Sequence, residues 1–216
     1  MLSADAKRSL ETQITQHQAE LHGADGAGAL SYLIGRGLTH QTIQCFRLGY
    51  DPGRHRIVIP YLNPEGAWGL KYRCLHDHDC KEAGHGKYTY DGGQELHLYN
   101  ASALLAASHV VVVEGEFKAM ATGQAGDPAV GYPGTQAWDK ADNEHWPYCF
   151  DSVESVVVVA DGDEPGRKAA ARVAKLLRGA PIDADVRVVD MPDGLDPDSF
   201  ILEYGVILYR ERLGFI

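Results

Sequence analysis

Acidic residues gather at three points of the sequence, and each group directly follows an apolar run. Side chains of this kind could hold a metal ion. Carboxylate oxygens are hard ligands, and none of the three groups contains a His or a Cys, so Mg²⁺ or Mn²⁺ suits them better than Zn²⁺. Without a cation, carboxylates gathered at one place would repel one another. In chain order the groups are Glu114 and Glu116, then Asp161 and Asp163, then Asp193, Asp196 and Asp198.

The apolar runs before these groups are predicted to be strands of one sheet. They alternate with segments of helical pattern, which is typical of a parallel or mostly parallel sheet covered by helices. Ligands of such sheets bind beyond the carboxyl ends of the strands. The three acidic groups are therefore expected along one sheet edge, where Gly115 and Gly162 permit sharp turns. The strands are expected at 109–113, 128–132, 155–160 and 184–189, and the helices at 116–124, 165–178 and, with a poorer pattern, 136–146.

Acidic residues before a helix also have a simpler explanation, because they stabilise the helix dipole from its N-terminus. Asp163 and Glu164 fit this explanation, and Glu116 could serve only as such a cap. Three acidic groups at the same edge of one sheet do not fit it, because their charges would repel. We therefore favour the metal site, with Glu114 at the tip of a rigid strand and directed into it.

The first hundred residues have a different pattern. A helix is expected from Ser3, a candidate N-cap, to about residue 21, followed by a glycine-rich joint at 23–28. This first helix could pack on the core or dock a partner protein. Short helices are expected at 29–37 and, capped by Thr39, at 39–46, whereas two apolar runs flanking Asn63-Pro64-Glu65-Gly66 indicate a hairpin. Residues 75–95 are polar and are expected to form a loop.

Charge is distributed unevenly along the chain. The formal net charge is −10, yet residues 36–90 hold eight Lys or Arg against five Asp or Glu, and residues 110–216 hold ten against nineteen. Both regions could simply be solvated faces. The same asymmetry would also arise if the basic region bound a polyanion and the acidic region bound cations.

Several motifs resemble one known family. E-G-E after one strand and D-G-D after another resemble the Toprim fold shared by DnaG-type primases, topoisomerases and some nucleases. The segment ALSYLIGRGLTHQTIQCFRLGYDP looks like the N-terminal subdomain of the DnaG-type primase core, and HRIVIPYLNPEGAWGLKYRCL looks like the hairpin that follows it. The elements GKYTY and HLYN, then ADGDEPGRKAA and PDGLDPDSF, continue in the family's order over about residues 28–204.

The resemblance implies an α/β fold, with a Toprim-type, mostly parallel sheet flanked by helices and preceded by a small mixed α+β subdomain. The expected division is an N-terminal helix and joint at 1–26, a basic subdomain at 27–105 and a Toprim metal-binding domain at 106–216. The implied activity is metal-dependent synthesis of short RNA primers from ribonucleoside triphosphates on single-stranded DNA. A Toprim nuclease, or a non-catalytic Toprim protein that binds DNA or a replisome partner, remains an alternative.

The resemblance also assigns roles to residues. Glu114 would lie nearest the chemistry, with Asp161 and Asp163 also catalytic and all three binding Mg²⁺ or Mn²⁺. Lys118 departs from the family pattern, because many members carry an Asp there. Further metal ligands or their supports would be Asp196 and Asp198, and basic residues that contact template or nucleotide would be Arg36, Arg73 and Lys87.

The cysteines offer no C-x-x-C pair, which argues against a disulfide framework or a zinc ribbon. The stretch CLHDHDC (74–80) holds four potential zinc ligands. In an extended chain these alternate residues all project to one side, an awkward arrangement around one tetrahedral ion, so zinc is not favoured here.

The surroundings of the motifs suggest location and partners. No apolar run approaches the ~20 residues of a membrane span, and the N-terminus lacks a signal peptide, so a cytoplasmic protein of a bacterium or a phage-infected host is expected. DnaG-type primases usually add an N-terminal zinc-binding module and a C-terminal helicase-docking module. About 25 residues precede the matching region and a dozen follow it. A separate protein carrying a zinc-binding or helicase-binding module is therefore an expected partner.

Overall fold

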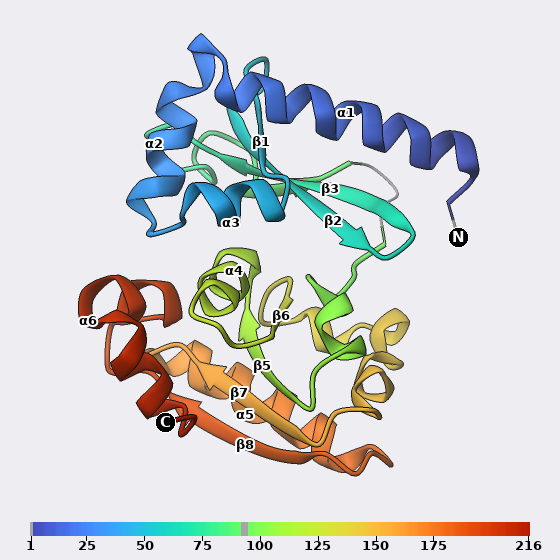
Figure 1. Cartoon of the computed structure of the whole chain (residues 1–216), viewed down its shortest axis with the longest axis vertical. Helices are drawn as coiled ribbons and strands as arrows, with labels where there is room; N and C mark the ends of the chain where they lie inside the picture. The colour runs from blue at the N-terminus through green and yellow to red at the C-terminus, as the bar shows by residue number, and fades with distance from the viewer. Residues whose placement is uncertain (1, 92–94) are drawn as a thin grey trace. The chain divides into compact units, whose positions relative to one another are not determined.

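The computed structural model describes residues 2–91 and 95–216. The chain divides into two compact units, one ending at Glu95 and the other beginning at Leu96 (Figure 1). Residues 96–105, which were expected in the first subdomain, belong to the second unit. Tyr99 explains this placement, because its backbone exchanges two hydrogen bonds of 2.7 and 3.0 Å with that of Gly131.

The first unit contains an antiparallel sheet whose strands follow chain order. The hairpin expected around Asn63 and Gly66 is confirmed, since these two residues are register partners across a two-residue turn. The last strand falls inside the region predicted to be a loop, because Tyr88 pairs with Arg73. The strands are β1 (Gly49–Asp51), β2 (Arg56–Asn63), β3 (Gly66–Cys74) and β4 (Tyr88–Tyr90).

The helices of the first unit begin at the predicted caps. The Ser3 hydroxyl accepts a hydrogen bond from the Ala6 amide at 3.2 Å, and the Thr39 hydroxyl accepts one from the Thr42 amide at 3.1 Å. These elements are α1 (Ala4–His22), the 3₁₀ turn η1 (Ala24–Gly26), α2 (Ala27–Gly35) and α3 (His40–Cys45).

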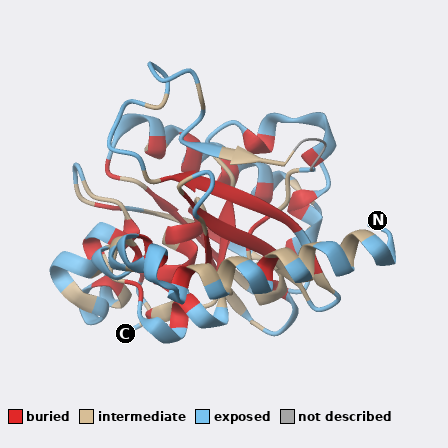
Figure 2. Ribbon diagram, turned by 90° about the horizontal axis from the view of Figure 1, so that it is seen from above, coloured by how far each residue is buried: buried red, intermediate tan, exposed pale blue. Residues whose placement is uncertain are grey.

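The long helix α1 packs on the sheet of its own unit rather than standing free. Ile14 is fully buried against Val58, Leu70 and Tyr72 of β2 and β3. Figure 2 shows buried positions along α1 and across the strands beneath it. The apolar side of α1 therefore belongs to the core, as one of the two sequence-based alternatives proposed.

The second unit contains the predicted parallel sheet. All its strand pairs are parallel, in the order β6-β5-β7-β8. The strands are β5 (His109–Glu114), β6 (Ala129–Tyr132), β7 (Ser155–Ala160) and β8 (Asp185–Asp190), within one or two residues of the predicted bounds. The α/β fold class is thereby confirmed.

Helices cover both faces of this parallel sheet. Val110, Val112, Val156 and Val158 pack with the buried side of α5 (Glu164–Gly179), and the alternate valines point to the other face, where α4 (Glu116–Gln124) contacts β5 and β6. The segment 136–146 contains two short 3₁₀ turns, η3 (Ala137–Asp139) and η4 (Ala141–Asn143), rather than a helix. Further 3₁₀ turns are η2 (Ala101–Leu105) and η5 (Trp146–Phe150).

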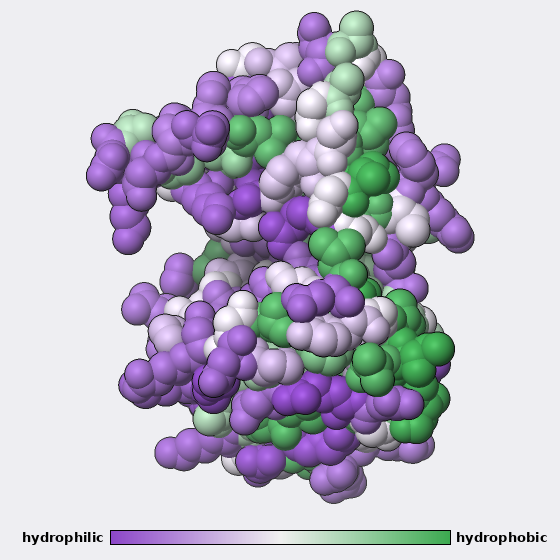
Figure 3. All heavy atoms as spheres, turned by 90° about the vertical axis from the view of Figure 1, so that its left-hand side faces the viewer, coloured by the Kyte–Doolittle hydropathy of each residue, from purple (hydrophilic) through white to green (hydrophobic). Residues whose placement is uncertain are grey.

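The last helix, α6 (Pro197–Arg212), is absent from the sequence-based predictions. Its helical pattern is broken at Gly205, which has a φ of 86°, and its apolar side chains are not confined to one buried stripe. Arg210 anchors it, since its Nε donates to the fully buried carboxylate of Asp127 at 3.0 Å. Figure 3, which views the side where α6 lies, shows hydrophobic residues at the surface among hydrophilic ones. The exposed apolar residues of α6 include Leu202, Tyr204, Ile207 and Leu208.

None of the helices in the described chain combines the length and the apolar character that crossing a bilayer requires.

Candidate functional site

Two acidic residues stand at the ends of neighbouring parallel strands in the second unit. Glu114 is the last residue of β5, and Asp161 directly follows β7. Val112 and Val158 are register partners, so both carboxylates reach the same sheet edge. The chain leaves β5 for β6 on one side and returns to β7 on the other. This reversal is the point where open α/β sheets bind their ligands.

The turn after β7 is held by very close backbone packing at Gly162. Its amide donates to the Leu195 carbonyl at 2.7 Å, and its carbonyl accepts from the Gly194 amide at 2.8 Å. A Cβ at this position would lie 1.8 Å from the carbonyl oxygen of Pro192. Only glycine permits this approach, which brings the loop at 192–195, and the Asp196 that follows it, to the turn that carries Asp161.

Two of the predicted ligands also cap helices. Asp163 is the N-cap of α5 and accepts from the Gly166 amide at 2.7 Å, and Asp196 is the N-cap of α6 and accepts from the Ser199 amide at 2.9 Å. The capping role that the sequence suggested for Asp163 is therefore present. Each cap uses one carboxylate oxygen, Oδ1, of its aspartate.

Electrostatics mark Asp161 as the centre of the acidic group. Burial raises the pKa of its carboxyl group, the ammonium of Lys118 opposes that rise, and the charges of Asp196 and Asp163 add to it. Lys118 forms an ion pair with Oδ2 of Asp161, and these side chains are only 14% and 17% exposed. Lys118 thus points into the acidic group and away from solvent.

The remaining oxygen of Asp161 is available for a ligand. Its Oδ1 is buried and accepts no hydrogen bond from any residue that the structure describes. At Asp196, burial raises the pKa, but hydrogen bonds with Asp198 and Ser199 outweigh it, so the pKa is lowered and the carboxylate stays ionised. Asp198 is itself buried in the first turn of α6.

Tyr132 is a member of this site that sequence reasoning missed. It ends β6 as the register partner of Glu114. Burial, followed by the negative charges of Glu114 and Asp161, raises the pKa of its phenol far above the ordinary value. Its place at the end of a strand, beside Glu114, is the signal that could have identified it.

Carboxylate oxygens of this kind suit a hard divalent cation, and the orphaned Oδ1 of Asp161 is one of them. Glu116, in contrast, is buried in the first turn of α4, where its charge raises the pKa of the buried Tyr99 phenol. That Glu114, Asp161, Asp163, Asp196 and Asp198 hold such an ion together stays a prediction.

In the first unit, two of the predicted basic residues converge on one phenol. Nη1 of Arg36 donates to the hydroxyl of Tyr32 at 3.2 Å, and Nε of Arg73 donates to the same oxygen. The two guanidinium carbons lie 6.0 and 5.0 Å from the centre of the Tyr32 ring. Helix α2 and strand β3 thereby place two cations around a single ring.

Strand β3 adds a lysine that sequence reasoning missed. Lys71 and Arg73 are two positions apart, so both project from the same side of the strand. In the register with β4, Lys71 is the partner of Tyr90 and Arg73 is the partner of Tyr88. The Lys71 ammonium lies 4.7 Å from the centre of the Tyr88 ring and 5.2 Å from the centre of the Tyr90 ring. The Arg73 guanidinium lies 5.4 Å from the centre of the Tyr88 ring. The spacing i, i+2 of two cations on a predicted strand is the signal that could have revealed this pair.

Lys87 lies beside this pair, directly before β4. Its carbonyl accepts from the Cys74 amide at 2.9 Å, and its side chain is exposed. The cation–aromatic side of the sheet, defined by Tyr32, Arg36, Lys71, Arg73, Tyr88 and Tyr90, is hereafter called the basic face.

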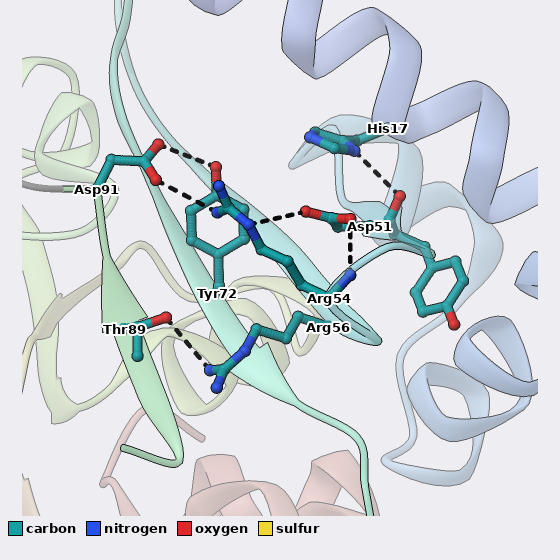
Figure 4. Close-up of polar contacts among 8 residues, drawn as sticks. His17, Asp51, Arg54, Arg56, Tyr72, Thr89 and Asp91 are labelled. Carbon is teal, nitrogen blue, oxygen red and sulfur yellow. Dashed lines mark hydrogen bonds and ion pairs between the residues drawn. The ribbon is translucent and has the colours of Figure 1, made fainter. Parts of the chain in front are cut away.

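Not every arginine nearby is available for a ligand. Figure 4 shows Arg54 held between Asp51 and Asp91, with ion pairs of 3.4 Å to each. Tyr72 donates to Asp91 at 2.9 Å and is buried on the α1 side of the sheet. Tyr72 is therefore a core residue rather than a surface on which a base could stack.

Comparisons with known proteins point in one direction. Residues 111–201 match a family described as Toprim-like. The chain is 34% identical over 163 residues to the Gene 57 protein of Mycobacterium phage D29, covering 73% of this chain and 97% of that protein. It is 32% identical over 169 residues to a DNA primase of Neisseria meningitidis, covering 76% of this chain and 28% of that protein.

A solved structure gives the same architecture. The structure of the DnaG primase catalytic domain bound to ssDNA has a TM-score of 0.77 and 23% identity, covering 94% of this chain and 76% of that one. At 23% identity, this comparison establishes that the two proteins share a fold and nothing more. The chain spans only about a quarter to two-fifths of the length of the curated DNA primases it matches.

Proposed function

Because this chain belongs to the DnaG-type primase family and carries that family's Toprim domain, we propose that it synthesises short RNA primers. The substrates would be ribonucleoside triphosphates, and the template single-stranded DNA. The observation that carries the proposal is Asp161, whose buried Oδ1 lacks a hydrogen-bond partner among the described residues at the strand-end edge shared with Glu114.

Primer synthesis joins a 3′-hydroxyl to the α-phosphate of a nucleotide. A bound Mg²⁺ or Mn²⁺ would gather the phosphate oxygens and stabilise the charge that develops on them. The chain's own part is to hold carboxylates in fixed positions. Glu114 and Asp161 are fixed by the strands, and Asp163 and Asp196 by their helix caps. Tyr132 keeps its phenolic proton at neutral pH, since its pKa is raised, and can donate a hydrogen bond there.

The basic face would bind the phosphates of template or nucleotide, with its tyrosines as surfaces for bases. Replacing Lys87 or Arg36 with glutamine is expected to weaken binding to single-stranded DNA. The slope of log affinity against log salt should fall by about 0.7 for each phosphate that the variant no longer binds. Fluorescence anisotropy at several salt concentrations measures both quantities.

A matched control is Arg8→Gln, which removes one positive charge from α1. Arg8 is highly exposed and pairs only locally with Asp5, and α1 covers the other side of the sheet. DNA binding should stay within error in this variant. An equal loss of affinity in Arg8→Gln and Arg36→Gln would show that net charge, rather than the basic face, governs binding.

Lys118 is expected to weaken metal binding, because its ammonium occupies Oδ2 of Asp161. Lys118→Gln should tighten Mn²⁺ binding by about tenfold or more, since unit charges ~4 Å apart interact by about 4 kcal/mol at an effective dielectric constant of 20. Calorimetric titration of the protein with Mn²⁺ measures the change. Lys168→Gln removes the same charge from an exposed pair with Glu164 and should change nothing. Equal or weaker Mn²⁺ binding in Lys118→Gln would contradict the proposed position of the ion.

The activity itself is tested with single-stranded DNA, labelled ribonucleotides and either Mg²⁺ or Mn²⁺. Short labelled RNA products that require template, nucleotides and metal together would support the proposal. Degradation of the DNA without incorporation would show a nuclease. DNA binding without either reaction would show a non-catalytic Toprim protein.

A further inference from the structure

Four zinc-type ligands meet at one point in the first unit, whereas the acidic group belongs to the second. The ligand atoms of Cys74, His78, Cys80 and His85 all lie within 4.8 Å of one another. Cys74 is the last residue of β3, and the other three lie in the loop that leads to β4. The loop is therefore tied back to the strand from which it emerges.

The path of the loop explains why the sequence did not reveal this arrangement. An extended chain would bring His76 together with His78 and Cys80. The chain turns instead after Asp79, whose carboxylate accepts from the amides of Lys81 and Glu82 at 2.7 and 3.0 Å. The turn closes where the His85 amide donates to the Cys80 carbonyl at 2.8 Å. His85 thereby becomes the fourth member of the cluster and His76 stays outside it.

The distances bracket those around a tetrahedral ion, so small side-chain shifts would admit one. Around Zn²⁺, with bonds of about 2.3 Å to sulfur and 2.0–2.1 Å to nitrogen, ligand atoms lie roughly 3.3–3.8 Å apart. Here Sγ of Cys74 lies 3.8 Å from Nε2 of His78, and the Nε2 atoms of His78 and His85 lie 2.9 Å apart. Two imidazole nitrogens aimed at one point need either a proton or a cation between them.

The outer partners of His85 orient its ring. Its Nδ1 lies 3.1 Å from the carbonyl oxygen of Gly86, and an Nδ1–H directed there leaves Nε2 as the bare nitrogen facing the cluster. Nη2 of Arg56, which can only donate, also lies 3.1 Å from the same Nδ1, so the two contacts require opposite tautomers, and an ion bound at Nε2 would select the one that donates to Gly86. Arg56 holds the loop as well, because its Nη1 donates to the Gly86 carbonyl at 3.3 Å and to the Thr89 hydroxyl at 3.2 Å. Figure 4 shows the contact between Arg56 and Thr89.

We propose that Cys74, His78, Cys80 and His85 bind a structural Zn²⁺. Two thiolates and two imidazoles in a tetrahedral arrangement are the donor set that zinc prefers. The ion would clamp the loop at 75–87 and so fix Lys87, which lies two residues beyond His85. The inference stands on the ligand cluster alone and does not depend on primer synthesis.

The test is Co²⁺ and Zn²⁺ binding by the full chain, stripped of metal under reducing conditions. We expect about one metal ion per chain. Bound Co²⁺ should show the intense visible bands of a tetrahedral site together with sulfur-to-cobalt charge transfer, and Zn²⁺ should displace it. Carboxylate sites give no sulfur charge-transfer band, so the signal distinguishes this cluster from the acidic group.

Two variants and one control locate the site. Cys80→Ser and His85→Ala alter half-exposed loop residues, so both chains are expected to fold and to lose the charge-transfer spectrum or reduce the affinity at least tenfold. His76→Ala removes a neighbouring imidazole that stacks on His78 but stands outside the cluster, and it should bind as the unaltered chain does. The proposal is overturned if the unaltered chain gives no tetrahedral spectrum, if His76→Ala loses the metal equally, or if Cys74 and Cys80 are found joined in a disulfide.

Discussion

Asp161→Asn is expected to lower the rate of primer synthesis by roughly 10²–10³-fold while the protein stays folded. The substitution keeps the shape of the side chain but removes the charge beside Glu114 that would hold the metal. Several kcal/mol of transition-state stabilisation depend on such an ion, and each 1.36 kcal/mol is worth tenfold in rate. The measurement is the initial rate of labelled primer formation at saturating template and nucleotide, together with calorimetric titration of Mn²⁺.

The thermal stability of Asp161→Asn, unlike its activity, is expected to stay the same or to rise. A carboxyl group whose folded-state pKa is raised lowers the stability of the fold at pH values above its unfolded-state pKa. The pKa of Asp161 is raised, chiefly by burial. Asp161→Asn should therefore unfold at an equal or higher temperature than the unaltered protein at neutral pH without metal. This result would exclude misfolding as the cause of the lost activity.

Asp190→Asn is the matched control. Asp190 ends β8 as the register partner of Ala160, so it is also an aspartate at a strand end, but its side chain is exposed. Primer synthesis should change by less than about twofold, because exposed charges are screened by solvent. Full activity in Asp161→Asn, or an equal loss in both variants, would contradict the proposed site.

Gly162→Ala is expected to destabilise the second unit by about 2–3 kcal/mol or more and to abolish primer synthesis. The added Cβ would lie 1.8 Å from the carbonyl oxygen of Pro192 and 2.9 Å from that of Leu195. Backbone atoms cannot rotate away as a side chain can, so the loop at 192–195 must move and carry Asp196 with it. Forced overpacking typically costs 1–3 kcal/mol. Thermal and urea unfolding measure the loss of stability.

Gly179→Ala controls for the removal of a glycine as such. A Cβ there meets no atom within 4 Å, and the residue is the last of α5. Alanine is the better helix former, so this variant should be as stable as the unaltered protein or up to about 1 kcal/mol more stable. If Gly162→Ala proves equally harmless, the close packing of the two loops does not hold the acidic residues in place.

Much of the second unit could be predicted because its local signals agree. The valine-rich runs at 109–113 and 155–160 predict buried strands, and a glycine shortly after each allows the sharp turn that follows the acidic residue. The parallel topology of the sheet then places the acidic residues after these strands at one edge, without any knowledge of side-chain contacts. Glu114 and Asp161 were accessible to sequence reasoning for this reason.

Other features depend on contacts between distant segments. The resemblance predicted an acid at position 118, and nothing in the sequence around Lys118 shows that its ammonium reaches Asp161, 43 positions away. The cluster that includes His85 depends on the path of a loop, for which no periodicity exists. Helix α6 is a different case, because Asp196 and Pro197 are a recognisable helix start that the irregular apolar pattern beyond them obscured.

The division of the chain at Glu95 also sets an order of events during synthesis. Every strand of the antiparallel sheet, and α1 that covers it, is made before β5 exists. At roughly 5–20 residues per second, the ribosome needs roughly 6–24 s to add the 121 residues of the second unit. The first unit therefore has seconds in which to fold alone. The second unit stays incomplete until Arg210 has been added, because the buried carboxylate of Asp127 pairs with it.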